Sequence, residues 1–148
     1  SYHKKLPKQV RNMMIEASEL EVLKVIGQGS FGTAHKAKWN DSYVCFKTIK
    51  LRNKKQPSPE MVALEKKLIV EMCSEAHKKS TLRHANTVQF LGVVLGSEHI
   101  GVVTEYTQLG DLQSLMRKSE RDKVMITESI ILRMILDTIC GLRYLHEL

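Results

Sequence analysis

The feature that most constrains the fold of this chain is a run of closely spaced glycines, Gly27-Gln28-Gly29-Ser30-Phe31-Gly32. A strand-like apolar pattern precedes it from Leu20 to Ile26, and a second one follows from Thr33 to Trp39. Glycine lets backbone N–H groups approach the oxygens of a ligand closely, so the turn is a candidate for holding phosphate. The spacing alone is also typical of an ordinary hairpin turn.

A dinucleotide-binding fold is a further interpretation of the same spacing. In that fold the glycine turn opens a helix, and an acidic residue lies about 20 positions further on to bind the ribose. Here the turn opens a strand, and residues 50–55 are basic instead. A hairpin that folds over nucleotide phosphates needs a lysine on the following strand. Lys47 occupies that place, in Val44-Cys45-Phe46-Lys47.

The rest of the chain predicts an α+β arrangement. Tyr43–Leu51 has the composition of a third strand. A helix should begin at Pro59, with Ser58 as its cap, because apolar residues then recur at helical spacing. Val88–Leu95 and Ile100–Tyr106 are two apolar runs that predict a β-hairpin. After Gly110 the pattern is helical, with helices expected over Leu112–Lys118, capped by Asp111, and from Thr127 to the end. We therefore expect a five-stranded antiparallel sheet with one long helix, followed by further helices.

Composition excludes several classes of protein. Lys and Arg number 23 against 16 Asp and Glu, a net charge of +7, but aromatic residues are only 5% and the basic residues are scattered, so nucleic-acid binding is not expected. No apolar run approaches the roughly 20 residues of a membrane span. Cys45, Cys73 and Cys140 lack the spacing of a zinc site or a disulfide framework, so a reducing compartment is expected, either the cytoplasm or the cytoplasmic part of a larger protein.

The ordered set of motifs resembles the protein kinase family, and within it the tyrosine kinases and tyrosine-kinase-like kinases. The resemblance covers about residues 18–148 and rests on six segments: Ile26–Ala34, Val44–Lys47, Leu82–Asn86, Val102–Tyr106, Gly110–Leu112 and Gly141–His146. It implies a basic lead-in over residues 1–17 and a kinase small lobe over residues 18–106. Residues 107–148 would then be the hinge and the start of the helical large lobe.

The resemblance also implies an ATP site. Lys47 would pair with the α- and β-phosphates and be held by Glu75, nine residues before His84, with Glu71 and Glu65 as alternatives. The residues implied to bind the nucleotide are Ile26, Gly27, Gln28, Gly29, Ser30, Phe31, Gly32, Ala34, Cys45, Lys47, Thr104, Glu105, Thr107 and Asp111.

Each part of this implied site has its own role. Ile26, Ala34 and Cys45 would form the small-lobe wall against adenine, with Cys45 standing where the family usually has alanine. Backbone groups of Glu105 and Thr107 would bind the adenine edge. Thr104 would line the back of the pocket. Asp111 would either contact the ribose or serve only as a helix cap.

The motifs that complete phosphoryl transfer in this family are not found in the 148 residues. The family uses HRD…N and DFG motifs to position the acceptor and to bind Mg²⁺. The sequence has four aspartates, and none lies in such a motif: Asp41, Asp111, Asp122 and Asp137. We expect the parent enzyme to transfer the ATP γ-phosphate to protein Ser/Thr or Tyr with Mg²⁺, and this chain, as an N-terminal portion cut within the large lobe, to be inactive and to hold no metal. The alternative is a catalytically dead, pseudokinase-like interaction module that self-associates through an exposed apolar helix face.

Overall fold

The computed structural model describes residues 8–29, 32–49, 59–96 and 100–148. Their backbone forms two compact units. The first unit comprises residues 1–82 and 89–106, and the second comprises residues 83–88 and 107–148.

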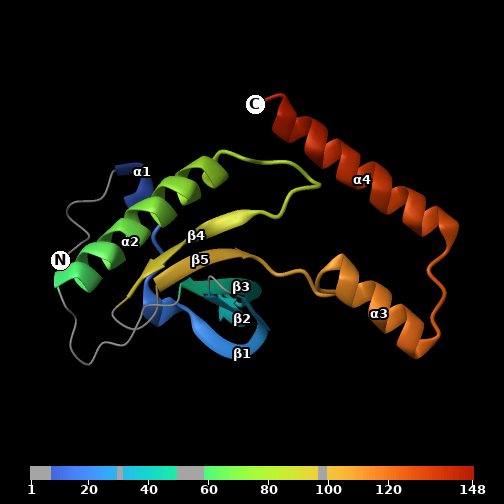
Figure 1. Cartoon of the computed structure of the whole chain (residues 1–148), viewed down its shortest axis with the longest axis horizontal. Coiled ribbons are helices and arrows are strands. Elements are labelled where there is room, and N and C mark those ends of the chain that lie inside the picture. Colours follow the sequence, from blue (N-terminus) through green and yellow to red (C-terminus); the bar gives the residue numbers. More distant parts are fainter. Residues whose placement is uncertain (1–7, 30–31, 50–58, 97–99) are drawn as a thin grey trace. The chain divides into compact units, whose positions relative to one another are not determined.

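The first unit is built on a five-stranded antiparallel sheet (Figure 1). The strands lie in the order β1-β2-β3-β5-β4. Their bounds are β1 Glu21–Gln28, β2 Gly32–Trp39, β3 Ser42–Ile49, β4 Phe90–Leu95 and β5 Ile100–Glu105. The α+β class and the five-stranded sheet predicted from the sequence are confirmed, although β4 begins two residues later than Val88.

One long helix, α2 (Pro59–Ser80), packs against β4 and β5 (Figure 1). Its buried residues Ile69, Met72, Cys73 and Ala76 recur at helical spacing, and they form one core cluster with Val93 and Ile100 of the sheet. Pro59 opens the helix, as expected, because its fixed φ suits the first helical position. The predicted cap at Ser58 lies outside the described residues.

A second core cluster lies within the sheet and joins all of the strands except β1. Its buried members are Ile15, Leu20, Ala37, Val44, Phe46, Val94 and Val103. Phe46 and Val103 are completely buried, whereas β1 keeps most of its side chains exposed.

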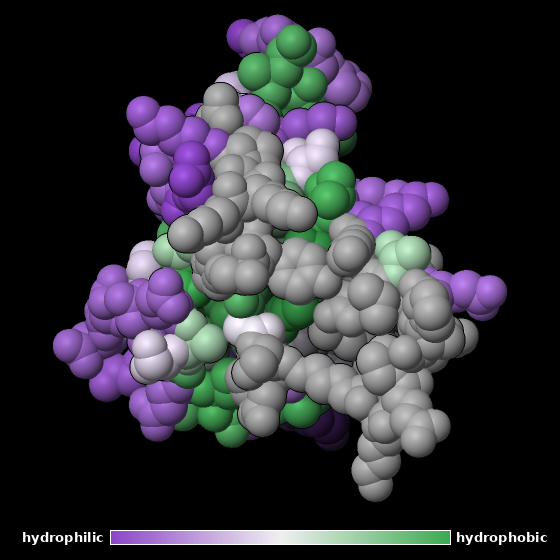
Figure 2. Space-filling view, turned by 90° about the vertical axis from the view of Figure 1, so that its left-hand side faces the viewer, coloured by the Kyte–Doolittle hydropathy of each residue, from purple (hydrophilic) through white to green (hydrophobic). Residues whose placement is uncertain are grey.

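On the side of the molecule shown in Figure 2, long hydrophilic side chains project outward and hydrophobic residues show between them.

A segment before the first strand also belongs to the first unit. Helix α1 (Lys8–Arg11) contacts α2, and the following residues Met13–Ile15 run along β4, before a short 3-10 turn, η2 (Ala17–Glu19). The Ile15 N–H donates to the Val93 carbonyl at 2.9 Å, and the Val93 N–H donates to the Met13 carbonyl at 2.8 Å. Residues Met13–Ile15, here called the strap, thus extend the sheet by one short parallel bridge. Treating residues 1–17 as a lead-in did not anticipate this packing.

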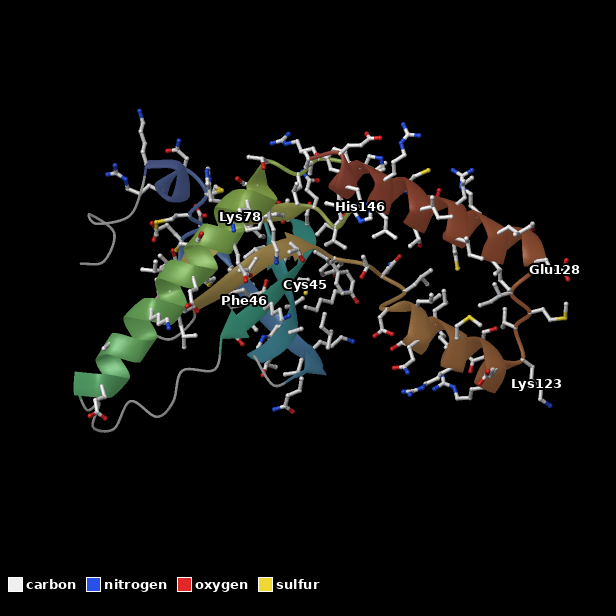
Figure 3. The ribbon with its side chains drawn as sticks, turned by 45° about the horizontal axis from the view of Figure 1, so that its top comes forward. Cys45, Phe46, Lys78, Lys123, Glu128 and His146 are labelled. Carbon is white, nitrogen blue, oxygen red and sulfur yellow. The ribbon has the colours of Figure 1, made fainter. Side chains whose placement is uncertain are left out.

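The second unit contains helices α3 (Leu112–Asp122) and α4 (Glu128–His146). Helix α3 is one turn longer than predicted. The residue that follows it, Lys123, adopts the left-handed conformation of a C-cap (Figure 3). The loop of residues 83–88 is held to α4 by Tyr144. Its ring stacks on His84 at 4.9 Å between centroids, and its hydroxyl accepts a hydrogen bond from the Arg83 N–H at 3.0 Å.

Candidate functional site

The glycine turn joins β1 to β2 as the sequence predicted. The Gly29 N–H donates to the Gly32 carbonyl at 2.9 Å, which closes the turn at its base. Gly27 lies opposite Ala34 across the strand pair, and a Cβ on Gly27 would meet the Ala34 Cβ at an ordinary 3.8 Å. Gln28 and Gly29 are exposed, while Ser30 and Phe31 lie outside the described residues.

Lys47 lies in the middle of the sheet, between Ala34 of β2 and Val102 of β5. Residues directly paired across strands share a face of the sheet. Val102 packs against the core cluster that α2 forms with the sheet, so Lys47 is on the face that α2 covers. Its side chain is nevertheless exposed. The strand therefore presents a cation on the same face as the long helix.

Cys45 lies one row further along this face, paired with Thr104 of β5 (Figure 3). Burial raises the pKa of the Cys45 thiol, while the Thr104 side chain, within hydrogen-bonding reach, and the positive charge of Lys47 act in the opposite direction. The Thr104 hydroxyl also donates to the Glu105 carbonyl at 3.2 Å. Cys45, Thr104 and Ala34 are each partly buried, and Ile26 at the end of β1 is 42% exposed.

The helix glutamates make local ion pairs in the described structure. Glu75 pairs with Lys79 at 3.9 Å, and Glu71 pairs with Lys67 at 3.9 Å, all four side chains being exposed. Among the described side chains, no ion pair joins Lys47 to α2. Pairs four residues apart on a helix are neighbours by geometry alone, so these contacts need no tertiary partner. The side chain of Glu65 is outside the described set.

Glu105, at the end of β5, is anchored to the segment that leads into β4. Its N–H donates to the Gln89 carbonyl at 2.9 Å, and its carboxylate accepts from the Gln89 N–H at 2.7 Å. The two residues are far apart in sequence, and nothing in the spacing pointed to Gln89. The backbone predicted to meet adenine is thus fixed by a reciprocal pair of hydrogen bonds.

In the second unit, the two predicted site residues flank a tight turn. The Gly110 N–H donates to the Thr107 carbonyl at 3.2 Å, and Gly110 has φ +75°, which favours glycine. Asp111 caps α3, its carboxylate accepting from the Ser114 N–H at 2.7 Å and from the Ser114 hydroxyl at 3.0 Å. These hydrogen bonds from Ser114 lower the pKa of Asp111. The cap role predicted for Asp111 is confirmed.

In the described ranges, no group of three or more His, Cys, Asp or Glu side chains is placed to hold a metal ion.

None of the helices described is both long and apolar enough to cross a membrane.

A glycine hairpin, a central strand lysine and a long helix on the same sheet face are the arrangement of a protein kinase small lobe. The family model described as "Protein tyrosine and serine/threonine kinase" matches residues 20–148. The chain therefore belongs to the protein tyrosine and serine/threonine kinase family.

Individual relatives agree with this assignment. The chain is 30% identical over 132 residues to probable serine/threonine-protein kinase drkB of Dictyostelium discoideum, covering 89% of this chain and 17% of the relative. It is 32% identical over 136 residues to serine/threonine-protein kinase CTR1 of Arabidopsis thaliana, covering 92% and 15%. It is 33% identical over 135 residues to serine/threonine-protein kinase VIK of the same plant, covering 90% and 28%. The chain thus spans less than a third of each of these relatives.

Proposed function

We propose that this chain is the ATP-binding part of a protein kinase that transfers the γ-phosphate of ATP to a protein hydroxyl. The observation that carries the proposal is the position of Lys47, a cation on the central strand, on the face that α2 covers and beside the small side chain of Ala34. The three relatives are named as serine/threonine-protein kinases, which favours serine or threonine as the acceptor over tyrosine. The protein substrate is left open.

Each residue of the proposed site has a definite task. Lys47 binds the α- and β-phosphates, and the glycine turn offers its N–H groups to the phosphate oxygens. Glu75 leaves Lys79 and pairs with Lys47 when nucleotide is bound, because a desolvated cation requires a partner. Ile26, Ala34 and Cys45 contact adenine, and Thr104 sets the depth of the pocket. Thr107 and Asp111, in the second unit, contribute a backbone group and a ribose contact.

Mg²⁺ and the acceptor-positioning groups belong to the HRD and DFG motifs, which the 148 residues do not contain. Mg²⁺ would neutralise charge on the transferring phosphoryl group in the parent enzyme. We therefore propose that this chain by itself binds ATP but does not transfer phosphate. A cytoplasmic location is part of the same proposal and is supported by three free cysteines, Cys45, Cys73 and Cys140.

The test is ATP binding by the 148-residue chain, measured by titration calorimetry. We expect Lys47→Met to weaken binding about 10- to 100-fold, because a charge-assisted hydrogen bond contributes about 1.5–3 kcal/mol. Lys38→Met is the matched control, since Lys38 is a strand lysine that pairs with Asp41 at 3.0 Å. Equal ATP affinity in wild type and Lys47→Met would contradict the proposal. Phosphotransfer by the wild-type chain that Lys47→Met abolishes would contradict its inactivity.

A second candidate function is that of an interaction module that associates with its own copy through α4. This helix exposes large apolar side chains on more than one side, with exposed fractions between 38% and 66%. They are Ile130, Ile131, Leu132, Ile135, Leu136, Ile139, Leu142 and Leu145. Apolar stripes at this spacing are those with which two helices pack against each other.

Self-association predicts a mass that rises with concentration in light scattering. Ile135→Glu should shift the chain to monomer, because it places a charge within the apolar face. Glu128→Gln, at the exposed start of the same helix (Figure 3), should leave the mass unchanged. A wild-type chain that stays monomeric over a hundredfold range of concentration would rule this function out.

A further inference from the structure

A lysine of β2 lies against two tyrosine rings near the end of β5. The Nζ of Lys36 is 3.6 Å from the centre of the Tyr43 ring and 4.9 Å from the centre of the Tyr106 ring. The two rings meet nearly edge to face, with centroids 6.5 Å apart and planes at 65°. An ammonium over an aromatic face is attracted by the ring quadrupole. Lys36, Tyr43 and Tyr106, here called the lysine cluster, therefore join three neighbouring parts of the sheet.

The lysine cluster borders the surface proposed to contact adenine. Lys36 is paired with Cys45 across β2 and β3, and Cys45 is paired with Thr104 across β3 and β5. These three residues form one row on one face of the sheet. Tyr43 lies two positions before Cys45 on the same strand, and so on the same face. Lys36 therefore belongs both to this row and to the lysine cluster, and the Tyr43 ring that it contacts lies beside the row.

Tyr106 directly follows Glu105, whose backbone is proposed to bind the adenine edge. Glu105 is already held on one side by its two hydrogen bonds with Gln89. Its main chain also pairs with Val44 of β3. Tyr106 has no such backbone ladder, because β5 ends at Glu105. Its ring contacts with Lys36 and Tyr43 hold its side chain.

We propose that Lys36 is a positioning residue for adenine binding: through Tyr43 and Tyr106 it holds the backbone that follows Glu105 in a single orientation. This inference rests on the proposed function, since it assumes that this backbone meets adenine. A backbone held in its binding orientation loses less conformational freedom when the ligand arrives. Lys36 thus acts on the adenine end of the nucleotide, whereas Lys47 acts on the phosphates.

The experiment compares ATP, adenosine and tripolyphosphate as three separate ligands of the 148-residue chain. Lys36→Met should weaken the binding of ATP and adenosine about three- to fivefold, through loss of its cation–π contacts with Tyr43 and Tyr106, and leave tripolyphosphate binding unchanged. Lys36→Arg should restore wild-type affinity, because a guanidinium also stacks on aromatic rings. Lys78→Met, at an exposed lysine of α2 (Figure 3), should change none of the three affinities.

Amide hydrogen exchange of the chain without added nucleotide provides an independent readout. The N–H groups of Tyr106 and Thr107 should exchange faster in Lys36→Met than in wild type, while those of β3 keep their rates. Unchanged exchange at both positions, or equal ATP affinity in Lys36→Met, overturns this inference. If wild-type affinity for ATP does not depend on Lys47, the proposed function fails instead, and the nucleotide part of this inference fails with it.

Discussion

Replacing Gly101 with alanine is expected to unfold the five-stranded sheet of the first unit under conditions in which the wild-type chain is folded. A Cβ at this position would lie 2.2 Å from the Lys47 carbonyl oxygen, 2.9 Å from the Lys47 carbonyl carbon and 2.9 Å from the Phe46 ring. The obstacle is mainly backbone of the central strand, which cannot rotate away. Overpacking of this kind costs about 3 kcal/mol or more, a large part of the roughly 5–15 kcal/mol that stabilises a domain.

The matched control is Gly27→Ala, because this glycine is also in a strand. A Cβ there would meet its nearest atom, the Ala34 Cβ, at 3.8 Å. Urea unfolding followed by fluorescence of Trp39, the single tryptophan of the chain, reports on the first unit because Trp39 packs against its core. A Gly101→Ala chain as stable as Gly27→Ala would show that β3 and β5 do not approach each other as described.

Shortening Ile15 to alanine is expected to lower the free energy of unfolding of the first unit by about 2–5 kcal/mol. Ile15 is 3% exposed and belongs to the same buried cluster as Phe46 and Val94. The surrounding backbone is fixed by the hydrogen bonds between Met13–Ile15 and Val93, so the cavity cannot close by a simple shift. Truncation therefore loses both the transfer free energy of the side chain and its packing contacts.

Glu16→Ala provides the comparison, since Glu16 is the next residue and is exposed. It should change the midpoint of urea unfolding little. The same Trp39 signal measures both variants. If Ile15→Ala and Glu16→Ala unfold at the same urea concentration, the strap is not part of the folded core.

The fold was predictable because its signals are local. Each strand is a short apolar run bounded by turn residues, and the stripe of Ile69, Met72, Cys73 and Ala76 specifies the buried face of α2. Strand order was not contained in this periodicity, and the order β1-β2-β3-β5-β4 was not predicted.

The parts that the sequence did not indicate depend on contacts between distant residues. The strap is three residues whose partner, Val93, is nearly 80 positions away, and no periodic pattern marks it. The lysine cluster similarly combines residues of β2 and β3 with Tyr106, the residue that follows β5. The family resemblance implied that Glu75 holds Lys47, whereas in the structure the exposed carboxylate of Glu75 pairs with Lys79. Its pairing with Lys47 stays a prediction for the nucleotide-bound chain.

The strap has a consequence for how this sheet behaves in a crowded solution. An outermost strand with unpaired N–H and C=O groups is a template on which another chain can add a strand and begin an aggregate. On β4 the strap occupies part of that template through its hydrogen bonds with Val93. On β1, at the opposite border, the register with β2 shifts twice and Glu21 and Lys24 carry charge, both of which disfavour strand addition. The residues before β1 therefore help to keep the molecule from joining its neighbours edge to edge.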